Sequence, residues 1–265
     1  MNNVGVILFD IDGVIRSVEK SYRLSLKKTV YKFCGWEPSY QDIDNAKNEG
    51  IWNNDWDLSL ELIKRNFKSK NLKRNPPQRE DIIRCFEDFY FGGDTNQDSR
   101  YWTGFIKNEE LLVEKEFFNL LSSNGISWGF VSGAESASAK FVLEKRLQLK
   151  SPPLIAMGDA PDKPDPKGLI HLASKLCRDD LGQANIPITY VGDTIADIQT
   201  VINARKVIPN QKFISIGLAP PHLHLESRIR ERNSYELKMR DAGADLILNS
   251  INDLKEIDKD FFKKY

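Results

Sequence analysis

Apolar and polar positions along the chain follow two recurring patterns. Short apolar runs that end in turn residues predict buried strands, because a strand covered on both faces is apolar throughout. Longer segments with apolar residues three or four positions apart predict helices. The predicted strands cover residues 6–9, 126–131, 154–157, 188–191, 212–216 and 245–248. The predicted helices among them cover residues 110–123, 136–147, 167–177, 194–204 and 225–240.

Strands that alternate with helices indicate an α/β protein with a parallel sheet and helices on both faces. The alternation is interrupted after the first strand. Residues 16–121 carry mostly helical patterns, with breaks at Gly35, Pro76-Pro77 and Gly92-Gly93. We therefore predict a helical insertion between the first and second strands of the sheet.

Charge and cysteine content narrow the class of protein. Lys and Arg together number 38, as do Asp and Glu, so no overall field attracts nucleic acid or a membrane surface. The cysteines Cys34, Cys85 and Cys177 are odd in number and far apart, which favours a reducing compartment. The sequence shows neither an export signal nor an apolar run of about 20 residues. We expect a soluble cytoplasmic protein, and no sequence feature predicts its oligomeric state.

Two aspartates separated by one residue end the first predicted strand. In extended backbone Asp10 and Asp12 point to the same side, at the carboxyl end of the strand, where open α/β sheets bind their ligands. Two carboxylates this close repel each other, and a hard divalent cation such as Mg²⁺ would offset the repulsion. An ordinary acidic turn before Gly13 would explain the same residues without a cation.

Four further polar residues fall at three later points of the chain, at the ends of later strands. Ser132 follows the strand 126–131, Lys163 lies in a loop before a helix, and Asp193 and Asp197 lie at a strand-to-helix junction. Taken alone, Ser132 is typical of a turn or cap, Lys163 of a solvated loop, and Asp193 of a helix cap. Their joint order at successive strand ends predicts that they surround one crevice.

In these residues the chain resembles the haloacid dehalogenase (HAD) superfamily, in subfamily IA, whose helical cap is inserted after the first strand. The matching motifs are Asp10-Ile11-Asp12-Gly13-Val14, Ser132, Lys163-Pro164-Asp165-Pro166 and Gly192-Asp193-Thr194-Ile195-Ala196-Asp197. The resemblance implies a Rossmann-like parallel sheet core, formed by residues 1–15 and 122–265, and a mostly helical cap domain of residues 16–121. In such caps, aromatic residues such as Trp52, Trp56 and Trp102 would mostly form the cap's core.

The resemblance also implies an enzyme, a Mg²⁺-dependent phosphatase that acts on a small phosphorylated metabolite through an aspartyl-phosphate intermediate. A carboxylate with an ordinary pKa near 4 is ionised at neutral pH, so Asp10 would attack phosphorus without a base. Asp12 would protonate the leaving oxygen and later deprotonate the attacking water.

The remaining motif residues would bind the cation and the phosphoryl group. Mg²⁺ is expected between Asp10, the backbone carbonyl of Asp12, and Asp193, while Asp197 supports the site without binding the ion. Ser132 and Lys163 are expected to hold the phosphoryl oxygens, and Lys163 also to neutralise Asp10.

Three other functions fit some of the same residues. A phosphomutase would use the same set and return the phosphoryl group to a substrate. A dehalogenase also uses an aspartate nucleophile but needs no second acid, so Asp12 counts against it. A catalytically silent protein that binds phosphometabolites would have lost a motif residue, and none is missing here.

Overall fold

The chain forms two compact units. The computed structural model describes residues 4–47, 49, 51–52, 54–177, 180–183, 186–256 and 261–264. Unit 1 comprises Met1–Ser17 and Leu111–Tyr265, and unit 2 comprises Val18–Glu110. The chain passes from one unit to the other at two short strands, β2 (Arg16–Ser17) and β3 (Glu110–Leu111), which pair with each other.

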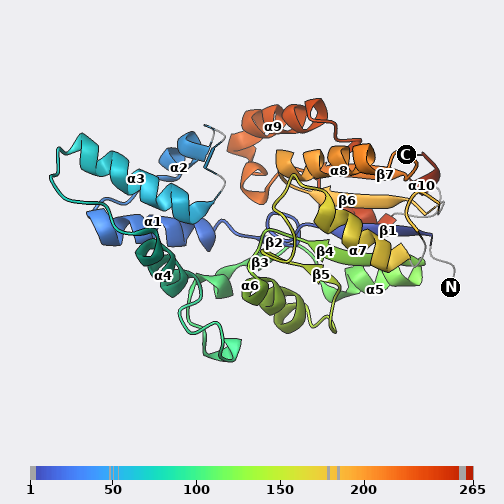
Figure 1. Ribbon diagram of the computed structural model, residues 1–265, viewed down its shortest axis with the longest axis horizontal. Helices are drawn as coiled ribbons and strands as arrows, with labels where there is room; N and C mark the ends of the chain where they lie inside the picture. The colour runs from blue at the N-terminus through green and yellow to red at the C-terminus, as the bar shows by residue number, and fades with distance from the viewer. Residues whose placement is uncertain are drawn as a thin grey trace. The chain divides into compact units, whose positions relative to one another are not determined.

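Unit 1 is built on a parallel sheet that has six strands within the described residues, in the order β5-β4-β1-β6-β7-β8 (Figure 1). Its strands are β1 (Gly5–Phe9), β4 (Ile126–Val131), β5 (Leu154–Ile155), β6 (Ile188–Gly192), β7 (Phe213–Leu218) and β8 (Leu246–Leu248). The strand β1 lies between β4 and β6, where Phe9 pairs with Phe130 on one side and Val191 on the other. The carboxyl ends of these three strands therefore meet at one edge of the sheet.

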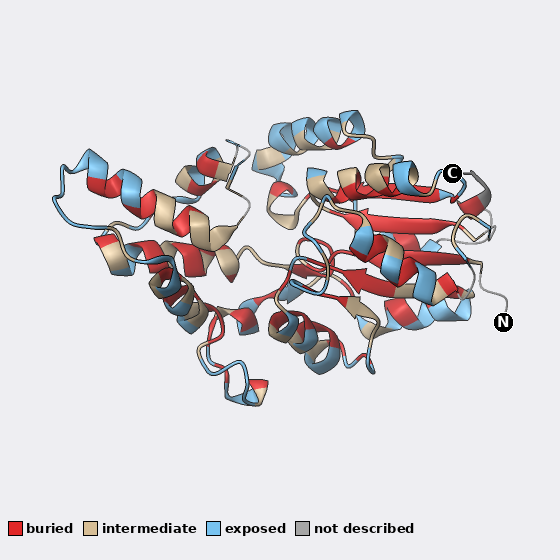
Figure 2. Cartoon of the chain, in the orientation of Figure 1, coloured by how far each residue is buried: buried red, intermediate tan, exposed pale blue. Residues whose placement is uncertain are grey.

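Helices cover both faces of this sheet, and alternate residues of β1 contact the helices on opposite sides. Ile7 and Phe9 belong to a buried cluster with side chains of α5 (Lys115–Ser123) and α6 (Ser136–Lys140). Val6 and Leu8 belong to a second cluster with α7 (Lys167–Cys177) and α8 (Ile195–Val207). Figure 2 shows the central strands buried along their length. The predicted fold class, a Rossmann-like α/β core with a helical insertion, is confirmed.

Unit 2 is mostly helical. Its helices are α1 (Tyr22–Cys34), α2 (Tyr40–Lys47), α3 (Asp55–Ser69) and α4 (Arg79–Tyr90), with short 3-10 turns at Ser99–Tyr101 and Phe105–Asn108. The core is aromatic: Tyr22 stacks on Tyr90 with ring centroids 4.3 Å apart, and Phe91 packs edge-on against Trp102. Trp102 is buried as expected, whereas Trp52 and Trp56 are only partly buried.

The division into units differs from the predicted domain boundaries at residues 15 and 121. The helix α5, most of which was assigned to the insertion, belongs to unit 1. The reason is packing, since Phe117 and Phe118 of α5 lie with their ring centroids 5.8 and 6.0 Å from that of Phe9. Arg16 also belongs to unit 1.

Some predicted elements have different limits in the structure. The helix predicted over 110–123 begins only at Lys115, because residues 110–111 form β3 and the Leu112 N–H bonds to the Ile15 carbonyl. The helix predicted over 225–240 is α9 (Ile229–Asp241), preceded by a 3-10 turn. The helix predicted over 136–147 is α6 followed by the wider π-helical turn Phe141–Arg146. Among the described helices, none has the length and apolar character needed to cross a membrane.

Candidate active site

The predicted motif residues lie at the carboxyl edge of the sheet in unit 1. Asp10 directly follows β1, and its N–H bonds to the Val191 carbonyl of β6 at 2.8 Å. Ser132 directly follows β4, and its N–H bonds to the Ile155 carbonyl of β5 at 2.9 Å. Asp193 directly follows β6. Pairing between neighbouring parallel strands therefore places these residues along one edge.

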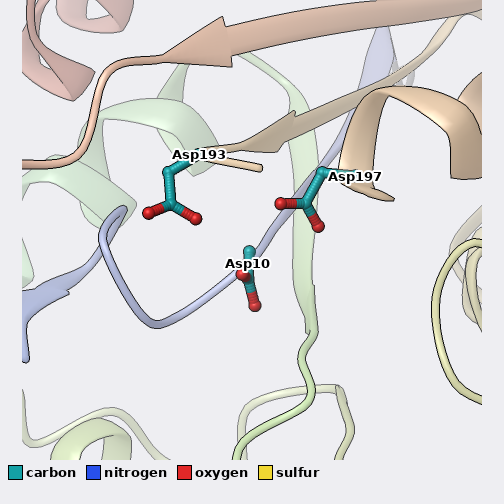
Figure 3. A group of neighbouring side chains, drawn as sticks. All are labelled: Asp10, Asp193 and Asp197. Carbon is teal, nitrogen blue, oxygen red and sulfur yellow. The ribbon is translucent and has the colours of Figure 1, made fainter. Parts of the chain in front are cut away.

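Three of the aspartates converge. Asp10, Asp193 and Asp197 each offer a carboxylate oxygen, and these oxygens lie within 4.8 Å of one another (Figure 3). Asp10 is 5% exposed and Asp197 is fully buried. Carboxylates this close and this poorly solvated disfavour each other's ionised form. The cluster therefore requires positive charge nearby.

Lys163 supplies part of that charge. Its Nζ lies 3.0 Å from Oδ2 of Asp10 and donates to Oδ1 of Asp197 at 2.6 Å. Burial by itself lowers the pKa of Lys163, but Asp10 and Asp197 together raise it well above its ordinary value, so the ammonium form is retained. One ammonium can neutralise only one of the three carboxylates when all of them are ionised.

Asp197 is occupied on both oxygens. Its Oδ1 accepts from Lys163 and lies 3.1 Å from the Tyr190 hydroxyl oxygen, while its Oδ2 accepts from the N–H and hydroxyl of Thr194 at 2.9 and 2.6 Å. In return Thr194 Oγ1 accepts from the Asp197 N–H at 3.2 Å, which completes a capping box at the start of α8. This geometry favours a supporting role in which Asp197 fixes Lys163 and the helix start.

Two glycines leave room for these carboxylates. A Cβ on Gly13 would lie 1.9 Å from Oδ2 of Asp193, and the φ of Gly13 is 76°, which is rarely adopted by other residues. A Cβ on Gly192 would lie 2.2 Å from the Cβ of Asp197. The glycines of the first and fourth motifs are therefore required by close approach of the acidic side chains.

Asp12 does not join the three-carboxylate cluster. Its Oδ1 accepts from Nε of Arg16 at 2.7 Å, and its side chain is 28% exposed. The pair of aspartates that ends β1 thus divides between two cations, Lys163 for Asp10 and Arg16 for Asp12. The sequence prediction that both carboxylates point to one side did not include this ion pair.

The expectation of an ordinary pKa for Asp10 is wrong. Burial, repulsion from Asp197 and repulsion from Asp12 outweigh the attraction of Lys163 and raise the pKa of Asp10 from 3.8 to about 6. Burial and the charges of Asp10 and Asp197 also raise the pKa of Asp193 well above its usual range. At neutral pH Asp10 is still mostly ionised, but less completely than an exposed aspartate.

The raised pKa of Asp10 predicts how stability depends on pH when no divalent cation is present. The folded state holds this proton until about pH 6, whereas an unfolded chain releases it near 3.8, so the folded state loses stability as pH rises through this window. We expect the free energy of unfolding in EDTA, measured with urea, to fall from pH 4 to 6.5 relative to that of Asp10→Asn. A difference that stays constant across this range would contradict the assignment.

The residues present fit a divalent cation. Among the described residues, the buried Oδ1 of Asp10 has no hydrogen-bond partner, and it belongs to a cluster in which three carboxylates face one ammonium. Carboxylate oxygens are the ligands that Mg²⁺ prefers. Since both oxygens of Asp197 are occupied, the oxygens of Asp10 and Asp193 are the ones left to bind a cation.

Three residues of the site were not predicted from sequence. Tyr190 donates to the Val131 carbonyl at 2.7 Å and lies against Asp197, and Tyr235 of α9 donates to the Asp193 carbonyl at 2.7 Å. Arg16 was expected in the insertion. Hydroxyl residues within the buried strand β6, Thr189 and Tyr190, are a signal that points to this strand without choosing between them. Tyr235 lies in a strongly charged helix that gives no such signal.

Comparison with known proteins agrees with this architecture. The haloacid dehalogenase-like hydrolase family matches residues 4–205. Phosphatase Tt82 from Thermococcus thioreducens superimposes with a TM-score of 0.60 at 23% identity, over 80% of this chain and 92% of that chain. A HAD hydrolase of family IA, variant 3, from Entamoeba histolytica has a TM-score of 0.61 at 14% identity, over 98% and 100% of the two chains. CbbY from Rhodobacter sphaeroides, solved with phosphate, has a TM-score of 0.54 at 15% identity, over 96% of each chain.

One curated relative is a longer protein. The imidazoleglycerol-phosphate dehydratase of Phytophthora nicotianae is 29% identical over 251 residues, which are 92% of this chain and 50% of that protein. The chain thus spans about half the length of this relative.

Proposed function

Because this chain belongs to the haloacid dehalogenase-like hydrolase family, and is therefore a hydrolase enzyme, we propose that it is a Mg²⁺-dependent phosphatase of small phosphorylated metabolites. The observation that carries the proposal is the environment of Asp10. One carboxylate oxygen pairs with Lys163 at 3.0 Å, and the other is buried without a hydrogen-bond partner among the described residues, beside Asp193. We assign unit 1 as the catalytic core and unit 2 as the cap domain.

In the first step, a carboxylate oxygen of Asp10 attacks phosphorus and forms an aspartyl phosphate. The bond from phosphorus to the substrate oxygen breaks, and Asp12 gives that oxygen a proton. In the second step, Asp12 takes a proton from water as the water attacks phosphorus, and the bond to Asp10 breaks to release inorganic phosphate.

Other residues of the site hold charge in place. We assign Mg²⁺ to Asp10, Asp193 and the backbone carbonyl of Asp12; the ion would neutralise carboxylates and phosphate together. Lys163 and Ser132 hold the phosphoryl oxygens, and Asp197 positions Lys163. General acid catalysis supplies about 10²–10⁴-fold, whereas phosphate-monoester hydrolysis can require up to about 10²¹-fold. Positioning and charge stabilisation therefore supply most of the acceleration.

A panel of phosphoesters tests the proposal. It contains sugar, glycerol, nucleoside and amino-acid phosphates. Imidazoleglycerol phosphate is included because the relative from Phytophthora nicotianae is named as a dehydratase of that compound. We expect release of inorganic phosphate from at least one of them with Mg²⁺. No release from any member would favour a binding protein, and transfer of the phosphoryl group between substrate carbons, followed by ³¹P NMR, would favour a phosphomutase.

Removal of divalent cations is expected to abolish phosphate release. Without added positive charge, Asp10 and Asp193 repel both each other and the substrate phosphate. Dialysis against EDTA should reduce the rate to background, and Mg²⁺ should restore it and raise the melting temperature. The rise should be larger at pH 7.5 than at pH 5, where Asp10 is mostly protonated. Full activity in EDTA would contradict the metal assignment.

A further inference from the structure

Arg16 is a fully buried guanidinium that the two-step mechanism does not use. Its exposed fraction is 0%, and it is the largest fully buried side chain in the part of the protein that the structure describes. Its Nε donates to Oδ1 of Asp12 at 2.7 Å, and its Nη2 donates to Oγ of Ser138 at 2.8 Å. Ser138 lies on α6, which follows the motif serine Ser132, and is itself fully buried.

The backbone between Asp12 and Arg16 holds this contact in place. The two residues form an isolated β-bridge, and the Gly13 N–H bonds to the Arg16 carbonyl at 2.8 Å. The N–H groups of Ile15 and Arg16 both bond to the Ile11 carbonyl. The loop therefore folds back so that the guanidinium of Arg16 contacts the carboxylate of Asp12, and the hydrogen bond to Ser138 holds the other end of the guanidinium.

A gain in stability does not by itself explain a buried arginine at position 16. Removing a guanidinium from water is costly, and an ion pair that is taken out of water is often no more stabilising than apolar residues of the same size. The contact does, however, immobilise the carboxylate that must reach the leaving oxygen. A misplacement of about 1 Å in a reacting group can cost about 10²-fold in rate.

We propose that Arg16 is a positioning residue that holds the carboxylate of Asp12 where it exchanges a proton with the leaving group. The inference rests on the proposed phosphatase function. Arg16, which is hydrogen-bonded to Ser138, then positions the carboxylate of Asp12 in the same way as Lys163 positions that of Asp10. Each carboxylate of the first motif then has its own cation, one directing the nucleophile and one directing the acid.

Comparing two substrates distinguishes a role of Arg16 in positioning Asp12 from a role in stabilising the fold. An alkyl phosphate such as β-glycerol phosphate needs a proton on its leaving oxygen, whereas p-nitrophenolate leaves without one. The quantity kcat/KM reports only the steps up to loss of the leaving group, so hydrolysis of the aspartyl phosphate does not affect it. We expect Arg16→Met to lower kcat/KM about 10²-fold for β-glycerol phosphate and less than about tenfold for p-nitrophenyl phosphate.

Matched variants complete the test. Arg16→Lys should recover part of the loss on β-glycerol phosphate, and Ser138→Ala should show a weaker form of the same substrate difference even if Arg16→Met does not fold. Arg205→Met is the control. Arg205 donates to the Phe213 carbonyl at 2.8 Å and pairs with Asp245, so its loss should lower kcat/KM equally for the two substrates, if at all. Equal losses on both substrates in Arg16→Lys and Ser138→Ala would overturn the positioning role alone. A wild-type protein that hydrolyses neither these probes nor any panel member would instead overturn the proposed function.

Discussion

Replacing Asp10 with asparagine is expected to abolish turnover while leaving the protein folded. The amide has the shape of the carboxylate but does not attack phosphorus, so no aspartyl phosphate forms. Loss of a catalytic nucleophile can cost about 10⁶-fold in kcat, and we expect a decrease of at least about 10⁴-fold. The fold should persist because burial and neighbouring acids already disfavour the charged form of Asp10, and Lys163 keeps its 2.6 Å bond to Asp197.

Phosphate release and covalent labelling measure this outcome together. Wild-type protein stopped in acid after a brief exposure to ³²P-labelled substrate should carry label, and Asp10→Asn should carry none. Asp159→Asn is a matched control, because Asp159 is an exposed aspartate whose side chain accepts a hydrogen bond from the Ala156 N–H. Mass spectrometry excludes deamidation back to aspartate. Retained turnover in the Asp10 variant would place the nucleophile elsewhere.

The sequence was sufficient to predict where most of the candidate site lies. Apolar runs locate the strands, and in a parallel sheet neighbouring strands end at the same edge. Asp10, Ser132 and Asp193 could therefore be grouped without a structure, because each directly follows a strand. Lys163 could be added only from its place before a helix in the joint order of these residues and from its motif, since the loop that carries it has no periodic pattern.

Side-chain pairing within the site could not be predicted in the same way. Alternation along a strand assigns Asp10 and Asp12 to one side, but the chain leaves the strand at Phe9 and turns, so the two carboxylates bind different cations. The turn also brings Arg16 back to Asp12, although its position in the sequence pointed to the insertion. Such contacts depend on backbone dihedrals over a few residues, which hydrophobic patterns do not encode.

Long-range packing explains the remaining differences. An amphipathic helix such as α5 presents the same pattern whether it packs on the sheet or on the insertion, and the contact of Phe117 and Phe118 with Phe9 decides between them. The bond from Tyr235 to the Asp193 carbonyl joins residues 42 positions apart. Its helix is so strongly charged that the sequence shows no face directed at the sheet.

Replacing Lys163 with methionine is expected to affect both activity and stability strongly. Lys163 is the cation between Asp10 and Asp197, and its side chain is only 16% exposed. Removing one partner of a buried ionic network costs about 3–5 kcal/mol, because the remaining charges stay buried without compensation. Loss of a group that stabilises charge in the transition state costs a further factor of about 10²–10³ in kcat.

Urea unfolding and phosphate-release kinetics test both effects of Lys163→Met. The loss of stability should shrink as pH falls from 7.5 to 5, because Asp10 then takes up a proton and the uncompensated repulsion decreases. Lys167→Met is the matched control, since Lys167 is 74% exposed and lies 3.9 Å from Asp165. Adding Asp197→Asn to Lys163→Met should destabilise the protein by less than the sum of the single changes, because the second change removes a charge that the first left uncompensated. Additive losses, or a Lys163→Met variant as stable as Lys167→Met, would show that the lysine does not hold the acidic cluster together.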